Sequence, residues 1–208
     1  MAAKRKKPRP LAGNPRRQAV AALRGYVYQI WHTVHAWLDL KDDDLLFVEG
    51  AEDFDVVSGE TTTAVQVKDT AARITLRTSA VIEAITHFWE LRNANPDRRV
   101  FFRFLTRSEI GVEQGAPFGA GVAGLELWKK ARVNTALLDS LREFLVKEGK
   151  LPLDLIEFLK AAEREALIAK LFVSVEWETK SREVEFVEVK FPRNGGRGWK
   201  WFMVVSFS

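Results

Sequence analysis

The sequence predicts an α/β protein in which helices flank a mixed β-sheet, with a C-terminal appendage of helices and strands. Apolar residues recur every three or four positions in some segments and at every second position in others, as in helices and strands respectively. These segments follow the order helix, three strands, helix, strand. A helix placed after three sequential strands indicates a crossover that returns the chain to a mixed sheet.

The first helix is predicted over residues 18–40, where apolar positions recur at steps of three and four. Gly25 lies inside it and costs about 1 kcal/mol relative to alanine, so we interpret it as a point of close packing. Three strands follow at 45–49, 54–57 and 62–68, the last rich in β-branched residues. Because Ser58-Gly59-Glu60 is typical of a turn, the second and third strands are expected to form an antiparallel hairpin.

A second helix is expected to begin at Thr78 or Ser79, either of which can cap it, and to end at Asn95-Pro96. Its predicted buried stripe is Val81, Ile82, Ile85, Phe88 and Trp89. Residues 99–106 are predicted to form an inner strand covered on both faces, because the segment is largely apolar. With the first three strands, it completes a four-stranded mixed core.

The C-terminal part begins with a glycine-rich loop over residues 107–124. Helices are expected next, and then two or three strands separated by turn residues. The helices are predicted at 125–132, 135–148 and 154–170, and the strands at 171–178, 183–191 and 199–207. We therefore divide the chain into a basic arm (1–17), a core domain (18–132) and the appendage (133–208).

Composition excludes several classes of function. The 208 residues include no cysteine, which excludes a disulfide framework, a cysteine nucleophile and a thiolate metal site, and fits a cytoplasmic location. No run of 18 apolar residues exists to span a membrane, and the N-terminus lacks the apolar stretch of a secretory signal. His32 and His35 lie three apart, but with one other histidine they favour a helix surface over a zinc site.

Charge is concentrated at the N-terminus. Of a net charge of +4, residues 1–17 contribute seven lysines and arginines and no acid. Such an arm suits either phosphate binding or simple solubilisation, and the sequence leaves both open, because a basic block attracts any polyanion.

The segment from Glu49 to Lys68 carries the residues with the clearest chemical pattern. Alternation along a strand places Gln66 and Lys68 on one face, and likewise Asp53 and Asp55 on one face of the preceding strand. Pairing of the two strands then sets a carboxylate opposite an amide and an ammonium group. Phosphodiester cleavage uses such a set, because a hard cation held by oxygen ligands activates water and a lysine stabilises developing charge.

Asp53 followed by Gln66-Val67-Lys68 resembles the D…(D/E/Q)-x-K signature of the PD-(D/E)xK nuclease superfamily. Residues 25–29 (GYVYQ), Glu49-x-x-Glu52-Asp53, residues 104–106 (FLT) and residues 124–128 (GLELW) further resemble the N-terminal nuclease domain of bacterial antiviral effectors. The resemblance covers about residues 20–130. It implies a restriction-endonuclease-like fold.

The resemblance also implies site residues and partners. Asp53 is the expected principal metal ligand and Gln66 the second, in place of the usual acid; Lys68 is the catalytic lysine, and Glu49 a further acid. Gln29 and Asp55 are supporting residues, and Asp55 competes with Asp53 because a two-residue slip of register exchanges them. The implied activity is Mg²⁺- or Mn²⁺-dependent cleavage of double-stranded DNA in antiphage defence, with a homo-oligomer or a separate sensor or NTPase as partner.

Arg103 and Arg107 are candidates for contact with the DNA backbone, against the alternative of ordinary solvated charges.

Two other interpretations of the protein's function remain. The same fold could be a catalytically inactive module that binds DNA or a partner protein. An interaction or immunity protein is the second alternative, and it predicts an exposed apolar patch at Trp199 and Trp201.

Overall fold

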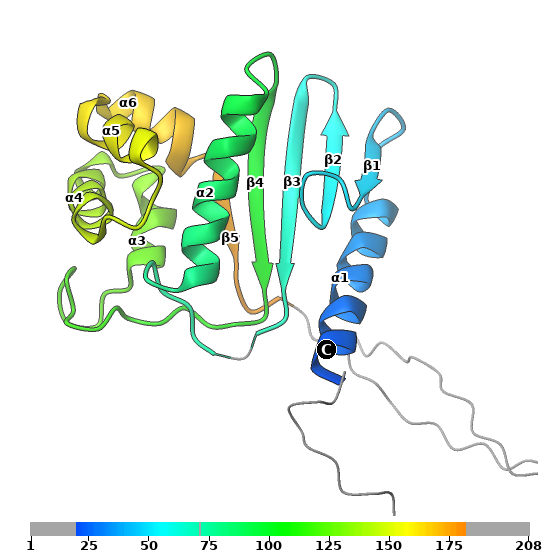
Figure 1. The fold of residues 1–208 in the computed structure, drawn as a ribbon, viewed down its shortest axis with the longest axis horizontal. Coiled ribbons are helices and arrows are strands. Elements are labelled where there is room, and N and C mark those ends of the chain that lie inside the picture. Colours follow the sequence, from blue (N-terminus) through cyan, green and yellow to red (C-terminus); the bar gives the residue numbers. More distant parts are fainter. Residues whose placement is uncertain (1–19, 71, 182–208) are drawn as a thin grey trace, which may run out of the picture.

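The computed structural model describes residues 20–70 and 72–181. The basic arm, the two predicted terminal strands and Trp199 and Trp201 lie outside the described residues. Within them, one mixed sheet has the order β1-β2-β3-β4-β5. The chain is thus an α/β protein with helices flanking a mixed sheet, as predicted (Figure 1).

All five strands lie where strands were predicted, but the sheet contains one strand more than the predicted four-stranded core. The strands are β1 (Leu45–Val48), β2 (Phe54–Ser58), β3 (Thr61–Lys68), β4 (Arg99–Thr106) and β5 (Val175–Glu178). β1 pairs antiparallel with β2, and β2 with β3, whereas β3, β4 and β5 are parallel. The expected four-stranded core is therefore wrong by one strand, because the chain returns after residue 170 and pairs β5 with β4.

The hairpin of β2 and β3 forms as its turn residues predict. Phe54 is opposite Val65, and Ser58 is opposite Thr61. Gly59 has a φ of +59°, a conformation that glycine adopts without steric cost. This register places the residues just before β2 beside the end of β3.

Helices cover both faces of the sheet. On one face, α1 (Val20–Leu38) packs Tyr28 against Phe54, Val65 and Val67. On the other, α2 (Ser79–Ala94) packs its buried residues against Phe102 and its neighbours of β4. Thr78 occupies the N-cap position of α2, but its hydroxyl accepts a hydrogen bond from the Thr75 N–H (2.9 Å) and does not cap the helix.

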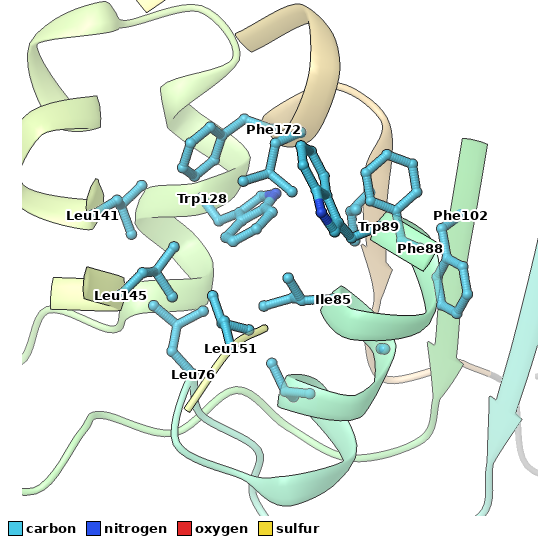
Figure 2. Packing of buried hydrophobic residues seen from close by; sticks show 14 of the residues in the cluster. Leu76, Ile85, Phe88, Trp89, Phe102, Trp128, Leu141, Leu145, Leu151 and Phe172 are labelled. Carbon is cyan, nitrogen blue, oxygen red and sulfur yellow. The ribbon is translucent and has the colours of Figure 1, made fainter. Parts of the chain in front are cut away.

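The large core extends from α2 into the C-terminal helices (Figure 2). Trp128, Leu141 and Phe172 are buried in the same cluster as Ile85 and Phe102. The helices involved are α3 (Gly124–Ala131), η2 (Thr135–Leu137), α4 (Leu138–Glu148), α5 (Leu153–Ala161), α6 (Arg164–Leu167) and η3 (Ile168–Phe172).

Two expectations about the helices are wrong. The helix expected over 154–170 is broken, because Ala162 and Glu163 are extended, with ψ of 144° and 159°. Gly25 does not mark close packing, since a Cβ built there meets nothing within 4 Å.

Candidate functional site

Strand β3 sets the predicted Gln-x-Lys pair on the α2 side of the sheet. Ala64 packs with the α2 core, whereas Val65 and Val67 pack with the α1 core. Alternation then carries Gln66 and Lys68 to the same side as Ala64. Gln66 is buried, with 4% of its surface exposed, and Lys68 is partly exposed.

The short loop between β1 and β2 brings Asp53 to the end of β3. The Glu49 N–H donates to the Asp53 carbonyl (3.0 Å), which closes the loop. Asp53 Oδ2 accepts a hydrogen bond from the Val67 N–H at 2.6 Å. Because Val67 stands between Gln66 and Lys68, this bond fixes the Asp53 carboxylate beside both predicted residues.

Glu52 connects the loop to β3 and to α2. Gln66 Nε2 donates to Glu52 Oε2 at 3.1 Å, and Glu52 Oε1 lies 2.8 Å from His87 Nδ1. The Glu52 side chain is only 10% exposed. The amide oxygen of Gln66 is buried and has no hydrogen-bond partner among the described residues. The site therefore contains two carboxylates and one unsatisfied amide oxygen, all hard oxygen donors.

Both carboxylates have raised pKa values, chiefly because burial disfavours their charged forms. For Glu52, interaction with His87 opposes the rise in pKa, and the neighbouring Asp53 charge adds to it. For Asp53, the Val67 N–H and Lys68 oppose the rise in pKa, and Glu49 adds to it. Burial and mutual repulsion of the acids therefore disfavour their charged forms, and a bound cation would offset that cost.

Glu49 and Gln29 lie next to this cluster. Gln29 Nε2 of α1 donates to Glu49 Oε1 at 2.9 Å. Gln29 thus contacts the site through Glu49, and Glu49 acts on Asp53 through its charge.

Asp55 has different surroundings from Asp53. Its side chain is buried (8% exposed), and Oδ2 accepts a hydrogen bond from the Ala51 N–H at 2.7 Å. It pairs with Ala64 across the hairpin and lines a pocket over the sheet. The charge of Lys68, by contrast, acts on Asp53, where it opposes the rise in that residue's pKa.

The two arginines proposed for DNA contact form ion pairs within the protein. Arg103 pairs with Glu178 of β5, and Arg107 pairs with Asp69, which also binds Arg24 Nε at 2.8 Å. Alternation along β4 places Arg103 on the α1 side with Leu105, on the opposite side of the sheet from Gln66. Arg103 therefore does not line the candidate site.

The donor set suits a hard cation. Mg²⁺ and Mn²⁺ take carboxylate and amide oxygens and keep several waters, and Asp53, Glu52 and the free oxygen of Gln66 are donors of this kind. No group of three or more histidine, aspartate or glutamate side chains in residues 20–70 and 72–181 is arranged to hold a metal ion. The amide oxygen of Gln66 would be the third donor beside the two carboxylates.

Sequence reasoning did not assign two residues of the cluster. Glu52 is part of the resembling motif, but the motif indicates no role for it, and the sequence around His87 does not link that residue to the site. His87 lies on α2, 35 residues from Glu52. No local pattern signals this contact, since it depends on how α2 crosses the sheet.

Comparison with protein-family models, with curated proteins and with solved structures finds no match to this chain. Among the described residues, no helix is both long and apolar enough to cross a membrane.

Proposed function

We propose that this protein is a metal-dependent endonuclease of the PD-(D/E)xK type that cleaves DNA. The observation that carries the proposal is the placement of Asp53 against the Val67 N–H, between Gln66 and Lys68. Two sequence segments 14 residues apart thereby join a carboxylate, an amide oxygen and a lysine at one strand end. The restriction-endonuclease-like fold belongs to this proposal. It is supported by the observed order of helix, antiparallel strands, helix and parallel strand.

The residues have distinct tasks in the proposed reaction. Asp53, Glu52 and Gln66 would hold Mg²⁺ or Mn²⁺, which supplies an activated water and neutralises phosphate charge. His87 and Gln66 keep the Glu52 carboxylate in place through the hydrogen bonds described above. Lys68 forms no ion pair with another described residue, so its ammonium group remains available to the phosphate or to the attacking water.

The wider role follows from the sequence resemblance. We propose double-stranded DNA as substrate and antiphage defence in the cytoplasm as the setting. A homo-oligomer or a separate sensor or NTPase would restrain the activity, because an unregulated nuclease harms its host.

The test is plasmid cleavage with and without Mg²⁺ or Mn²⁺. Wild-type protein should cut only with metal, and Lys68→Ala should lower the rate at least about 100-fold, because it removes transition-state charge stabilisation. Asp53→Asn should abolish cutting through loss of a metal ligand. Lys160→Ala, at an exposed position of α5, is the matched control and should cut like the wild type.

Two results would count against the nuclease. Equal cutting by Lys68→Ala and wild type would show that the activity does not come from this site. No cutting in either metal, with equal DNA binding by both proteins, would favour the inactive binding module. The cluster offers two carboxylates and an amide where three acids could bind a metal more strongly, and this observation favours the second function.

A further inference from the structure

The outer face of α1 carries large apolar side chains that the described part of the chain leaves uncovered. Six of them have exposed fractions between 40% and 68%. They are Leu23, Tyr26, Ile30, Val34, Trp37 and Leu38. A helix at a protein surface normally carries polar residues on the side away from its core. Because α1 packs Tyr28 against the sheet and is also apolar on this outer face, it has the pattern of a helix that is covered on two sides.

This outer face of α1 is large enough to serve as an interface. The helix lies at the end of the molecule away from α3 to α6, where it is open to a partner (Figure 1). Its exposed apolar side chains present roughly 600 Å², the upper end of the largest patch that a monomer usually exposes. Two copies packed on this face would remove roughly 1,200 Å² from water, which is the lower bound for specific interfaces. A second copy of the chain is therefore a sufficient partner.

The spacing of the exposed residues is symmetric about Ile30. From Leu23 to Trp37 the steps are three, four, four and three residues, and these positions fall within an arc of about 80° on the helix. The steps are the same from either end, so an antiparallel copy with a twofold axis at Ile30 sets Leu23 against the partner's Trp37. The same axis sets Tyr26 against the partner's Val34. Each pair joins an aromatic to an aliphatic side chain, as a self-complementary twofold interface requires.

Charge favours the antiparallel direction as well. The exposed residues Asp39, Asp42 and Asp43 follow the end of α1. A parallel pair of helices would bring the acidic turns of both copies together, and like charges would repel. An antiparallel pair places the two turns at opposite ends of the interface and sets the helix dipoles in opposite directions.

We propose that the outer face of α1 is a dimer interface, on which α1 of a second copy packs antiparallel across a twofold axis at Ile30. The proposal does not depend on the nuclease activity. Gln29, next to Ile30, donates to Glu49 at 2.9 Å, so the interface lies beside the candidate site. None of the proposed metal ligands belongs to it.

Cysteine cross-linking of the full chain tests the geometry, because the sequence contains no cysteine. Ile30→Cys should form a disulfide-linked dimer under mild oxidation, since the twofold axis brings this position against itself. Tyr26→Cys and Val34→Cys should each stay unlinked, because the two copies of either position lie about 12 Å apart along the helix axis. The double variant with both cysteines should link. Lys160→Cys, exposed on α5, is the control for random collision and should stay unlinked.

Light scattering of the full chain at about 100 µM measures the mass directly. Wild-type protein should be a dimer. Ile30→Asp should be a monomer with an unchanged circular-dichroism spectrum, because a charge is buried at the centre of the interface and stays exposed in the monomer. Leu153→Asp replaces an exposed apolar residue of α5 and should remain a dimer. Lys68→Ala should also remain a dimer, which separates this test from that of the nuclease.

Three results would overturn the proposal. The first is a monomeric wild type at about 100 µM. The second is an Ile30→Asp protein that keeps the dimer mass. The third is linking of Tyr26→Cys alone as readily as Ile30→Cys, which would indicate parallel helices. If the wild type is a monomer and cysteines at positions 30 and 201 link within one chain, the outer face of α1 belongs to the C-terminal segment 182–208.

Discussion

The carboxamide of Gln66 lets two acids share the end of β3. Its nitrogen donates to Glu52, while its oxygen has no partner in the described part of the chain. A third carboxylate at this position would add repulsion to Glu52 and Asp53, whose pKa values are already raised. Glutamine thus supplies an oxygen donor without a further charge.

His32 on α1 is a half-buried polar residue, with a consequence for stability. Burial, followed by the nearby charges of His35 and Arg103, lowers its pKa from 6.5 to about 4. The unfolded chain therefore takes up a proton at a higher pH than the folded protein. Stability from this group is present above pH 6.5 and is lost as the pH falls toward 4.

His32→Phe tests this expectation and keeps a ring against Tyr28, whose ring centroid lies 4.6 Å away. Between pH 7 and pH 4, the wild type should lose about 1–2 kcal/mol more unfolding free energy than the variant, after allowance for partial exposure. Urea unfolding at several pH values measures the difference. Parallel pH profiles for the two proteins would contradict it.

At the scale of elements, the start of α3 depends on a buried acid in the glycine-rich loop. Glu113 is 2% exposed and accepts hydrogen bonds from the Leu76 N–H (3.0 Å) and the Gly124 N–H (2.8 Å). Gly124 is the first residue of α3. The carboxylate thus satisfies a free N–H of the helix and ties it to the segment that precedes α2.

Gly124→Ala should destabilise the protein by about 1–3 kcal/mol. The added Cβ would lie 2.5 Å from Leu76 Cδ1 and 2.7 Å from Glu113 Oε1. Gly25→Ala is the matched control inside α1, where a Cβ meets nothing within 4 Å, and it should stabilise by about 0.5–1 kcal/mol. Urea unfolding measures the unfolding free energy of both variants. An unchanged value for Gly124→Ala would show that the residues around position 124 move aside at little cost.

The larger of the two hydrophobic cores joins one face of the sheet to the C-terminal helices. Buried residues of β3 and β4 belong to the same cluster as Leu155 and Leu159 of α5. β5, which follows these helices, pairs with β4. The C-terminal helices should therefore unfold together with the sheet.

Leu159→Ala tests this cooperativity. Leu159 is fully buried, so its truncation should cost about 2–5 kcal/mol of unfolding free energy. Leu153→Ala, on the same helix but 80% exposed, should change it by less than about 0.5 kcal/mol. If the core is one unit, amide exchange in β3 and β4 should accelerate together with that in α5. Acceleration confined to α4 and α5 would separate the appendage from the sheet.

The sequence by itself determined the features that depend on neighbours along the chain. The two-residue period of Val65 and Val67 determines the side of Gln66 and Lys68, and the turn at Gly59 determines the antiparallel hairpin. The spacing of apolar residues likewise predicts α1 and α2. Such patterns are readable because a backbone of fixed geometry imposes its period on the side chains.

The tertiary structure alone decided the features that join distant segments. The contact of Glu52 with His87, the pairing of β5 with β4 and the pocket around Asp55 all depend on how helices and strands pack. The break between α5 and α6, at Ala162 and Glu163, was not predicted from the sequence either. Local periodicity does not predict these contacts, because they depend on burial and hydrogen bonding over the whole molecule.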